Sequence, residues 1–154
     1  MDNLLGTDLV VIPYLATHDA DQVDLVRVQT RLRGKQVTGG GKPYDLQTFS
    51  GRENLAQALI LRLLTPKGSL AGLGHAEYGS QLYRLIGEHK NGATRNLCRA
   101  YVLEAVAQEP RVEPKAVALN FDLDAETLDS FAFTLEVQPL AGGDPLSLNL
   151  EVAI

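Results

Sequence analysis

The sequence predicts an α+β fold, with helices in the middle of the chain and a small, mainly antiparallel sheet from its C-terminal third. Apolar residues recur at helical spacing between about residues 53 and 108, and from Pro110 onward they recur at every second residue. A chain of 154 residues can bury a core without a disulfide or a metal. We expect a strand-rich N-terminal extension at residues 1–45 and an α+β domain at residues 46–154, together forming one compact unit.

The N-terminal extension contains several short segments typical of strands. Residues 8–15 are apolar, and Pro13 restricts them to a strand end or an edge strand. Residues 24–33 alternate over ten positions, which predicts a strand with one basic, solvent-facing side. A glycine turn at residues 39–41 is followed by a return strand at residues 44–49.

Three helices are expected at about residues 53–64, 80–86 and 93–108. Ser50 and Glu53 have the spacing of a capping box, and Pro66 ends the first helix at Thr65. Ser80 is a candidate cap for the short second helix, which Gly87 would end. The buried face of the third helix is expected to comprise Leu97, Cys98, Tyr101, Val102, Ala105 and Val106.

Three strands are expected after the helices, because apolar residues alternate with smaller or polar ones. The turn between the second and third strands is AGGD at residues 141–144, a typical hairpin sequence. The alternating positions are Val117, Leu119, Phe121 and Leu123, then Phe131, Phe133, Leu135 and Val137, then Leu146, Leu148, Leu150, Val152 and Ile154.

Net charge and hydropathy each argue against one class of partner. Fourteen Lys and Arg against nineteen Asp and Glu give a net charge of −5, which disfavours binding to nucleic acid. No apolar run approaches the roughly 20 residues that cross a membrane. Residues 122–154 hold seven acidic residues and no Lys or Arg. This acidic segment is either a solvated face or a surface for a basic partner.

Several residues that could carry chemistry lack the pattern that such chemistry needs. His18, His75 and His89 lie in separate stretches, so no metal site is expected. The glycines at residues 68–74 form no phosphate-binding motif, and no cofactor is expected. Cys98 lies on an apolar helix face as a small core residue. The lone cysteine and the absence of a signal peptide suggest a cytoplasmic protein.

The glutamates of the helical region leave an enzymatic alternative open. Two of Glu77, Glu88, Glu104 and Glu109 could serve as the acid and base of a small lysozyme-like glycoside hydrolase. The chain has no Trp for an aromatic sugar platform, which counts against this alternative.

The sequence Glu109-Pro110-Arg111 follows the third helix and forms a distinctive local pattern. A glutamate near a helix C-terminus is mildly unfavourable, and proline fixes the direction in which the chain leaves. Arg111 offers a guanidinium just beyond. These residues are either a recognition element or an ion pair inside the domain.

Three motifs occur in an order and spacing that resemble one family: LLTPKGS at residues 63–69, EYGSQL at residues 77–82 and EPRV at residues 109–112. The segment SGRENLAQALILRLL at residues 50–64 is similar to the helix before the family's T-P-x-G turn. Over residues 46–121 the chain resembles the sheath initiators, baseplate wedge proteins of contractile phages, tailocins, extracellular injection systems and type VI secretion baseplates. The longer N-terminal extension and the glycine-rich loop at residues 70–76 match no feature of that family.

The resemblance implies a structural protein rather than an enzyme, assembled in the cytoplasm and then part of the tail or injection particle. Six copies would surround the inner tube, near the hub proteins, and bind the contractile sheath protein and the other wedge proteins. Glu109, Pro110 and Arg111 would be the wedge-docking residues. The positions of packing and turns in the shared motifs would be Thr65, Pro66, Gly68, Tyr78 and Gly79.

The resemblance also implies that the protein holds the first sheath ring by strand exchange, which needs an open sheet edge. The C-terminal strands lack lysine, the common protector of exposed edges. The candidate strand-exchange residues are therefore Phe131, Phe133, Leu135, Leu146, Leu148 and Leu150. A generic α+β adaptor remains the third possibility if the motif match is coincidental.

Overall fold

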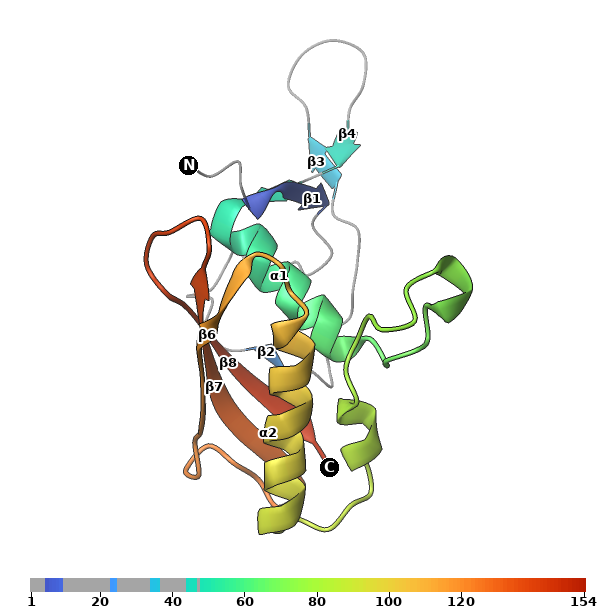
Figure 1. Ribbon diagram of the computed structural model, residues 1–154, viewed down its shortest axis with the longest axis vertical. Coiled ribbons are helices and arrows are strands. Elements are labelled where there is room, and N and C mark those ends of the chain that lie inside the picture. The colour runs from blue at the N-terminus through green and yellow to red at the C-terminus, as the bar shows by residue number, and fades with distance from the viewer. Residues whose placement is uncertain (1–4, 10–22, 25–33, 37–43, 47) are drawn as a thin grey trace.

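The structure is a computed structural model that describes residues 5–9, 23–24, 34–36, 44–46 and 48–154. It confirms the α+β class: helices α1 (Gly51–Leu64) and α2 (Gly92–Ala107) pack on a sheet built mainly from the C-terminal third of the chain (Figure 1). Two short 3-10 turns, η2 (Ala71–Leu73) and η3 (Leu82–Leu85), lie between the helices. In the described part of the chain, no helix is long and apolar enough to cross a membrane.

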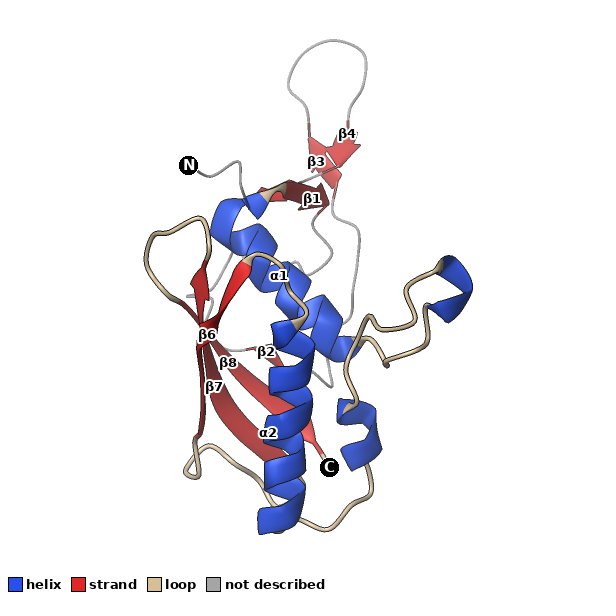
Figure 2. Ribbon diagram, in the orientation of Figure 1, coloured by secondary structure: helices blue, strands red, loops and turns tan. Residues whose placement is uncertain are grey.

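The main sheet has the strand order β2-β8-β7-β6. Strands β6 (Val112–Phe121), β7 (Ser130–Pro139) and β8 (Leu146–Ala153) are antiparallel, whereas β2 (Val23–Asp24) pairs in parallel with β8 (Figure 2). Two smaller pairs complete the described strands. They are β1 (Thr7–Leu9) with β5 (Thr48–Ser50), and β3 (Gly34–Gln36) with β4 (Tyr44–Leu46).

The core lies between the helices and one face of the sheet. Alternating residues of β7 and β8 oppose one another there, as in the pairs Phe133 with Leu150 and Leu135 with Leu148. The opposite face is polar, since Thr134 Oγ1 bonds Asn149 Oδ1 at 2.7 Å. The helices contribute Leu55, Leu59, Ile60 and Leu63 from α1, and Cys98, Val102, Ala105 and Val106 from α2. The period-two and helical patterns therefore predicted this packing correctly.

The cap of α1 and the length of the middle helix differ from the sequence prediction. Ser50 is the N-cap of α1, but its side chain makes no capping hydrogen bond, so the predicted capping box is wrong. Instead Asn91 caps α2, where its Oδ1 accepts from the amide of Thr94 at 2.9 Å. The helix expected at residues 80–86 is only the 3-10 turn η3. The Ser80 hydroxyl before it accepts from the amide of Leu82 at 3.3 Å and donates to the carbonyl of Leu63 at 2.6 Å, which ties Ser80 to the end of α1.

Two residues expected in the core are exposed. Leu97 lies on the outer side of α2, at the margin of the apolar face. Leu123 lies beyond β6, which begins earlier than expected and ends at Phe121. The predicted turn at residues 141–144 does join β7 to β8, and both of its glycines have positive φ.

The structure tests the predictions for the N-terminal extension only in part. Strand β1 covers the start of the segment expected at residues 8–15, and the return strand expected at residues 44–49 forms the two short strands β4 and β5. Residues 10–22, 25–33 and 37–43 lie outside the described residues, and with them His18, most of the alternating segment and the glycine turn.

A buried ion cluster ties the connection between β6 and β7 to the start of α2. The Glu126 carboxylate lies 2.9 Å from Lys90 Nζ and accepts from Arg95 Nη2 at 2.9 Å. Burial would raise the pKa of Glu126, but the hydrogen bonds from Arg95 and Lys90 outweigh it and lower the pKa. The Arg95 guanidinium also stacks over the rings of Phe121 and Phe131, which joins this cluster to the core.

Candidate functional site

The segment Glu109-Pro110-Arg111 forms a sharp turn between α2 and β6. The Glu109 amide donates to the carbonyl of Val106 at 2.9 Å, and the Glu109 carbonyl accepts from the amide of Val112 at 3.2 Å. Pro110 is exposed at the corner of this turn. The chain thereby leaves the helix and enters the sheet within a few residues, and we call residues 109–111 the elbow.

The side chain of Glu109 is only 3% exposed and is held by two arginines. Its Oε1 accepts from Arg111 Nε at 2.6 Å, and its Oε2 accepts from Arg62 Nη2 at 3.3 Å. Burial alone would raise the pKa of Glu109, but Arg111 and Arg62 outweigh burial and lower the pKa. Glu109 is therefore an ionised carboxylate inside an Arg–Glu–Arg cluster.

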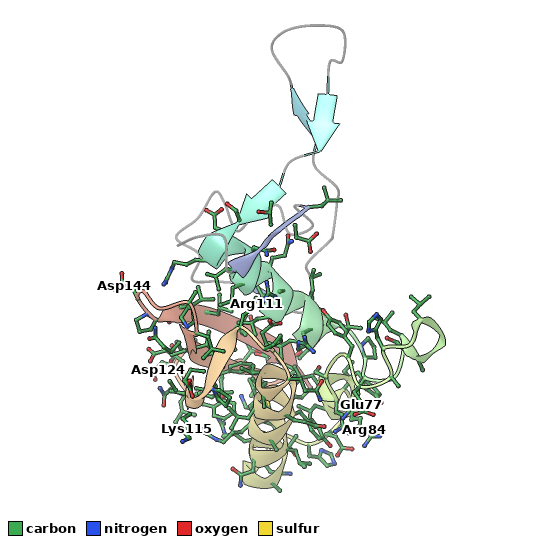
Figure 3. The ribbon with its side chains drawn as sticks, turned by 45° about the horizontal axis from the view of Figure 1, so that its top comes forward. Glu77, Arg84, Arg111, Lys115, Asp124 and Asp144 are labelled. Carbon is green, nitrogen blue, oxygen red and sulfur yellow. The ribbon has the colours of Figure 1, made fainter. Side chains whose placement is uncertain are left out.

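Arg111 also reaches the N-terminal segment (Figure 3). Its Nη1 donates to the carbonyl of Leu5 at 2.9 Å, and the same carbonyl accepts from Asn54 Nδ2 at 2.8 Å. Nearby, Gln57 Nε2 donates to the carbonyl of Leu9 at 2.7 Å. The buried amides of α1 and the elbow arginine together clamp residues 5–9 against the domain.

No motif in the sequence points directly to this clamp. Asn54 and Gln57 interrupt the apolar pattern of α1 and are nonetheless buried, which is the one hint that a backbone segment lies on them. The ion pair of Arg62 with Glu109 likewise has no signal in the sequence, because Arg62 lies 47 residues before Glu109 and nothing in the local pattern links the two.

The structure therefore contains the internal ion pair that was one of the two interpretations of the elbow. Glu109 is buried and pairs with Arg111, so a partner can reach only Pro110 and the part of Arg111 that is exposed, about 27% of its side chain. Docking through the elbow remains a prediction, now limited to that outer surface.

The residues of the other two motifs, LLTPKGS at residues 63–69 and EYGSQL at residues 77–82, form the stem of a loop. The Ser80 amide donates to the carbonyl of Thr65, and the Lys67 amide donates to the carbonyl of Ser80, both at 2.8 Å. Gly79 has φ +109°, and a Cβ there would lie 2.4 Å from the Thr65 oxygen. Only glycine fits this position, because a side chain there would collide with the backbone at Thr65 and Pro66.

Tyr78 links this stem to the elbow. The Arg62 guanidinium lies 4.4 Å from the centre of the Tyr78 ring, so one arginine contacts both Tyr78 and Glu109. Gly68 begins the loop with φ +88° and has free space around it. Thr65, Pro66, Gly68, Tyr78 and Gly79 thus lie at packing and turn positions around one structural junction.

The strand-exchange candidates lie in the core, and only some of them are on a strand with an outer edge. Strand β7, with Phe131, Phe133 and Leu135, is paired with β6 on one side and β8 on the other, so it is not an open edge. Strand β8, with Leu146, Leu148 and Leu150, pairs on its outer side with β2 at Leu150 and Glu151. The edge of β6 carries exposed Pro114 and Lys115, which protect it.

The four glutamates of the enzymatic alternative do not form a single cluster, although Glu77 and Glu104 share Lys67, whose Nζ lies 3.1 Å from Glu77 and 2.6 Å from Glu104. Glu104 is paired with Lys67 at 2.6 Å and Gln81 at 2.8 Å, and these hydrogen bonds lower its pKa. Glu109 is buried in its arginine cluster, while Glu77 and Glu88 are exposed. In the part of the chain that the structure describes, no group of three or more His, Cys, Asp or Glu could hold a metal ion.

Neither a protein-family model nor a curated protein matches the chain. Among solved structures, its fold matches the crystal structure of a "putative tail lysozyme" from Geobacter sulfurreducens with a TM-score of 0.55. The two chains are 17% identical, and the match covers 66% of this chain and 89% of the other. At this identity the match establishes a shared fold.

Proposed function

We propose that the protein is a structural component of the baseplate of a contractile tail or injection machine, where it anchors the first ring of sheath subunits and docks to other wedge proteins. The observation that carries this proposal is the junction at which the three motifs meet: Arg62 contacts both Tyr78 and Glu109. The fold shared with a protein described as a tail lysozyme supports an association with a phage-type tail.

Wedge docking would use the outer surface of the elbow. Glu109 holds Arg111 in place from inside, while Pro110 and the exposed part of Arg111 face the partner. Arg111 also bonds Glu109 and the Leu5 carbonyl inside the protein, so a variant at this position would disturb folding and docking together. The sharper variant is Pro110→Asp, which alters an exposed side chain and should exclude the protein from particles without lowering its melting temperature by more than a few degrees.

Sheath anchoring would use the outer edge of β8. An incoming sheath strand would pair with β8 beside or in place of β2, since β7 has no free edge. Deleting β8 is a poor test because Leu146, Leu148 and Leu150 are core residues. Hydrogen exchange is better suited: mixing with the sheath subunit should slow exchange of β8 amides and leave β7 unchanged. Unaltered exchange throughout the sheet would contradict sheath anchoring.

The lysozyme-like alternative is favoured by one observation, the description attached to the structure with the shared fold. The lowered pKa values of Glu104 and Glu109 count against it, because a general acid needs a raised pKa. Incubation with purified peptidoglycan decides between the two. Release of soluble fragments by the wild type, lost in a Glu104→Gln, Glu109→Gln double variant that still folds, would establish the enzyme and reject the purely structural function.

A further inference from the structure

The loop between α1 and η3 projects from the body of the molecule on a closed stem (Figure 1). Two backbone hydrogen bonds of 2.8 Å join Thr65 and Lys67 to Ser80, and Gly79 allows the two sides to touch. On the stem, Lys67 Nζ lies 3.1 Å from Glu77 and 2.6 Å from Glu104 of α2. Figure 3 shows Glu77 on the side of the molecule from which the loop projects.

The loop has a defined shape although it contributes nothing to the core. No residue of η2 is buried, yet the Leu70 carbonyl accepts from the amides of Leu73 at 3.0 Å and His75 at 3.1 Å. Gly74 ends this turn with φ +83°. A surface loop with few packing contacts usually has weaker internal order, so hydrogen bonding here preserves a specific projecting form.

The tip of the loop is apolar and uncharged. Between Lys67 and Glu77 the sequence has no charged residue, and the two flanking charges pair with one another at the stem. Leu73 is 75% exposed at the tip. Single exposed leucines are common and need no explanation, but an ordered, projecting and neutral tip is typical of an element that inserts into a partner.

An open recess with a mixed polar and apolar lining lies beneath the loop. It has a volume of about 720 Å³, and its walls include His75 and Glu77 from the loop, Arg62 from α1 and Gln108 after α2. These side chains offer donors and acceptors to a chain segment that passes under the loop. The loop and the recess together have the form of a hook, which we define as residues 68–79.

We propose that this hook docks a different protein: Leu73 enters an uncharged apolar pocket of that protein, and a polar segment beside the pocket fills the recess. Charge argues for a different protein rather than a second copy, because two chains of net charge −5 repel each other. The residues of the hook differ from those of the elbow and of the β8 edge, although Arg62 and Gln108 bring the recess next to the elbow. This contact is therefore additional to those of the proposed function.

Photo-crosslinking in the cells that produce the protein tests the hook directly. Benzoylphenylalanine replaces Leu73 in one variant and Leu128 in the control, because Leu128 is 96% exposed on the connection between β6 and β7. We expect position 73 to crosslink to one other protein, at apolar residues identified by mass spectrometry, and position 128 not to do so. No crosslink, equal crosslinking from both positions, or a crosslink to a second copy would overturn the proposal.

A matched pair of substitutions then measures the contact with the crosslinked protein. Leu73→Asp should weaken binding by roughly tenfold or more, since it places a charge in an apolar pocket, whereas Leu128→Asp should not change it. Both variants should unfold at the wild-type temperature, because neither side chain is in the core. Equal affinities for the two variants would overturn the hook. A crosslinked partner unrelated to tails would reject the baseplate function while leaving the hook intact.

Discussion

Arg62 and Glu109 lie 3.3 Å apart and join the last turn of α1 to the residue at which the chain turns away from α2. Glu109 stands where the partial negative charge of a helix end disfavours a carboxylate by some tenths of a kcal/mol. Two guanidinium groups, from Arg62 and Arg111, outweigh this effect. The cluster thereby fixes the relative position of α1, the end of α2 and the start of β6, and joins the motif at residues 109–112 to the helix that leads into the motif at residues 63–69.

Replacing Glu109 should destabilise the protein strongly. Glu109→Gln leaves two partly buried guanidinium groups without a counter-charge, which we expect to lower the free energy of unfolding by about 3 kcal/mol. Urea denaturation at pH 7 measures the change. Glu104→Gln is the matched control, because the Glu104 carboxylate is more exposed and its loss should cost much less. Equal losses in the two variants would contradict the structural role of the cluster.

Stability should fall in acid. Glu109 and Glu126 both have a lowered pKa in the folded protein, so their contribution is full above the unfolded-state pKa of about 4.3 and is lost as pH falls through the folded values. Urea unfolding between pH 7 and pH 3 should show a steep loss below about pH 5. Glu126→Gln should make the loss shallower, and a pH-independent wild type would refute the assignment.

The bond from Arg111 to Leu5 should control the order of the N-terminal segment. Arg111→Lys keeps the charge but cannot bond both Glu109 and the Leu5 carbonyl, because lysine lacks the guanidinium fork. We expect exchange of the Gly51 amide, which donates to the Gly6 carbonyl, to speed up by about tenfold in this variant. Arg84→Lys, on the exposed side of η3, should leave that amide unchanged. An unaffected Gly51 amide in Arg111→Lys would mean that Asn54 suffices to hold the segment.

Much of the fold could be predicted from the sequence, because long segments repeat with one period. The buried residues of α1, α2, β7 and β8 follow from spacings of 3.6 and 2. The starts of the helices could not be predicted with equal success, since Ser50 and Asn91 are both acceptable caps and only Asn91 forms the bond. Leu123 alternates correctly but lies beyond the last residue of β6 that pairs with β7.

The candidate site was predicted only in part, because its key contacts join distant segments. The pattern around Glu109 suggested a nearby arginine and identified Arg111, but Arg62 and Leu5 lie far away in the chain. A period of two also shows which face of a strand is buried without showing its neighbours. For this reason the sequence pattern makes β7 and β8 equal candidates for an open edge, whereas β7 is in the middle of the sheet.

Gly79 should tolerate no side chain. Gly79→Ala would place a Cβ 2.4 Å from the Thr65 carbonyl oxygen at a positive φ, so we expect a loss of about 2 kcal/mol or more in unfolding free energy. Gly74→Ala is the control: it has a similar φ and free space, and should cost only about 1 kcal/mol. Chemical denaturation of both variants gives the comparison. If Gly79→Ala is as stable as Gly74→Ala, the close contact at the loop stem is wrong.

The thiol of Cys98 should react only when the protein opens. Burial raises its pKa to about 12, even though Arg95 and Arg99 favour the thiolate. At pH 8 a thiol reagent should therefore label the folded protein very slowly, with a rate that rises with urea as unfolding does. Ser69→Cys provides an exposed thiol for comparison and should be labelled at once. Rapid labelling of Cys98 in the native protein would contradict its core position.

The clamp on Leu5 has a consequence for synthesis of the chain. Leu5 leaves the ribosome well before its partner Arg111, which lies 106 residues later. At about 5–20 residues per second, the N-terminal segment waits roughly 5–20 s before the elbow can bind it. During that time its backbone has strand β5 and the side-chain amides of α1 as partners within the domain. A chaperone or an assembly partner that meets the nascent chain would therefore find Leu5 accessible, whereas Leu5 is buried in the folded protein.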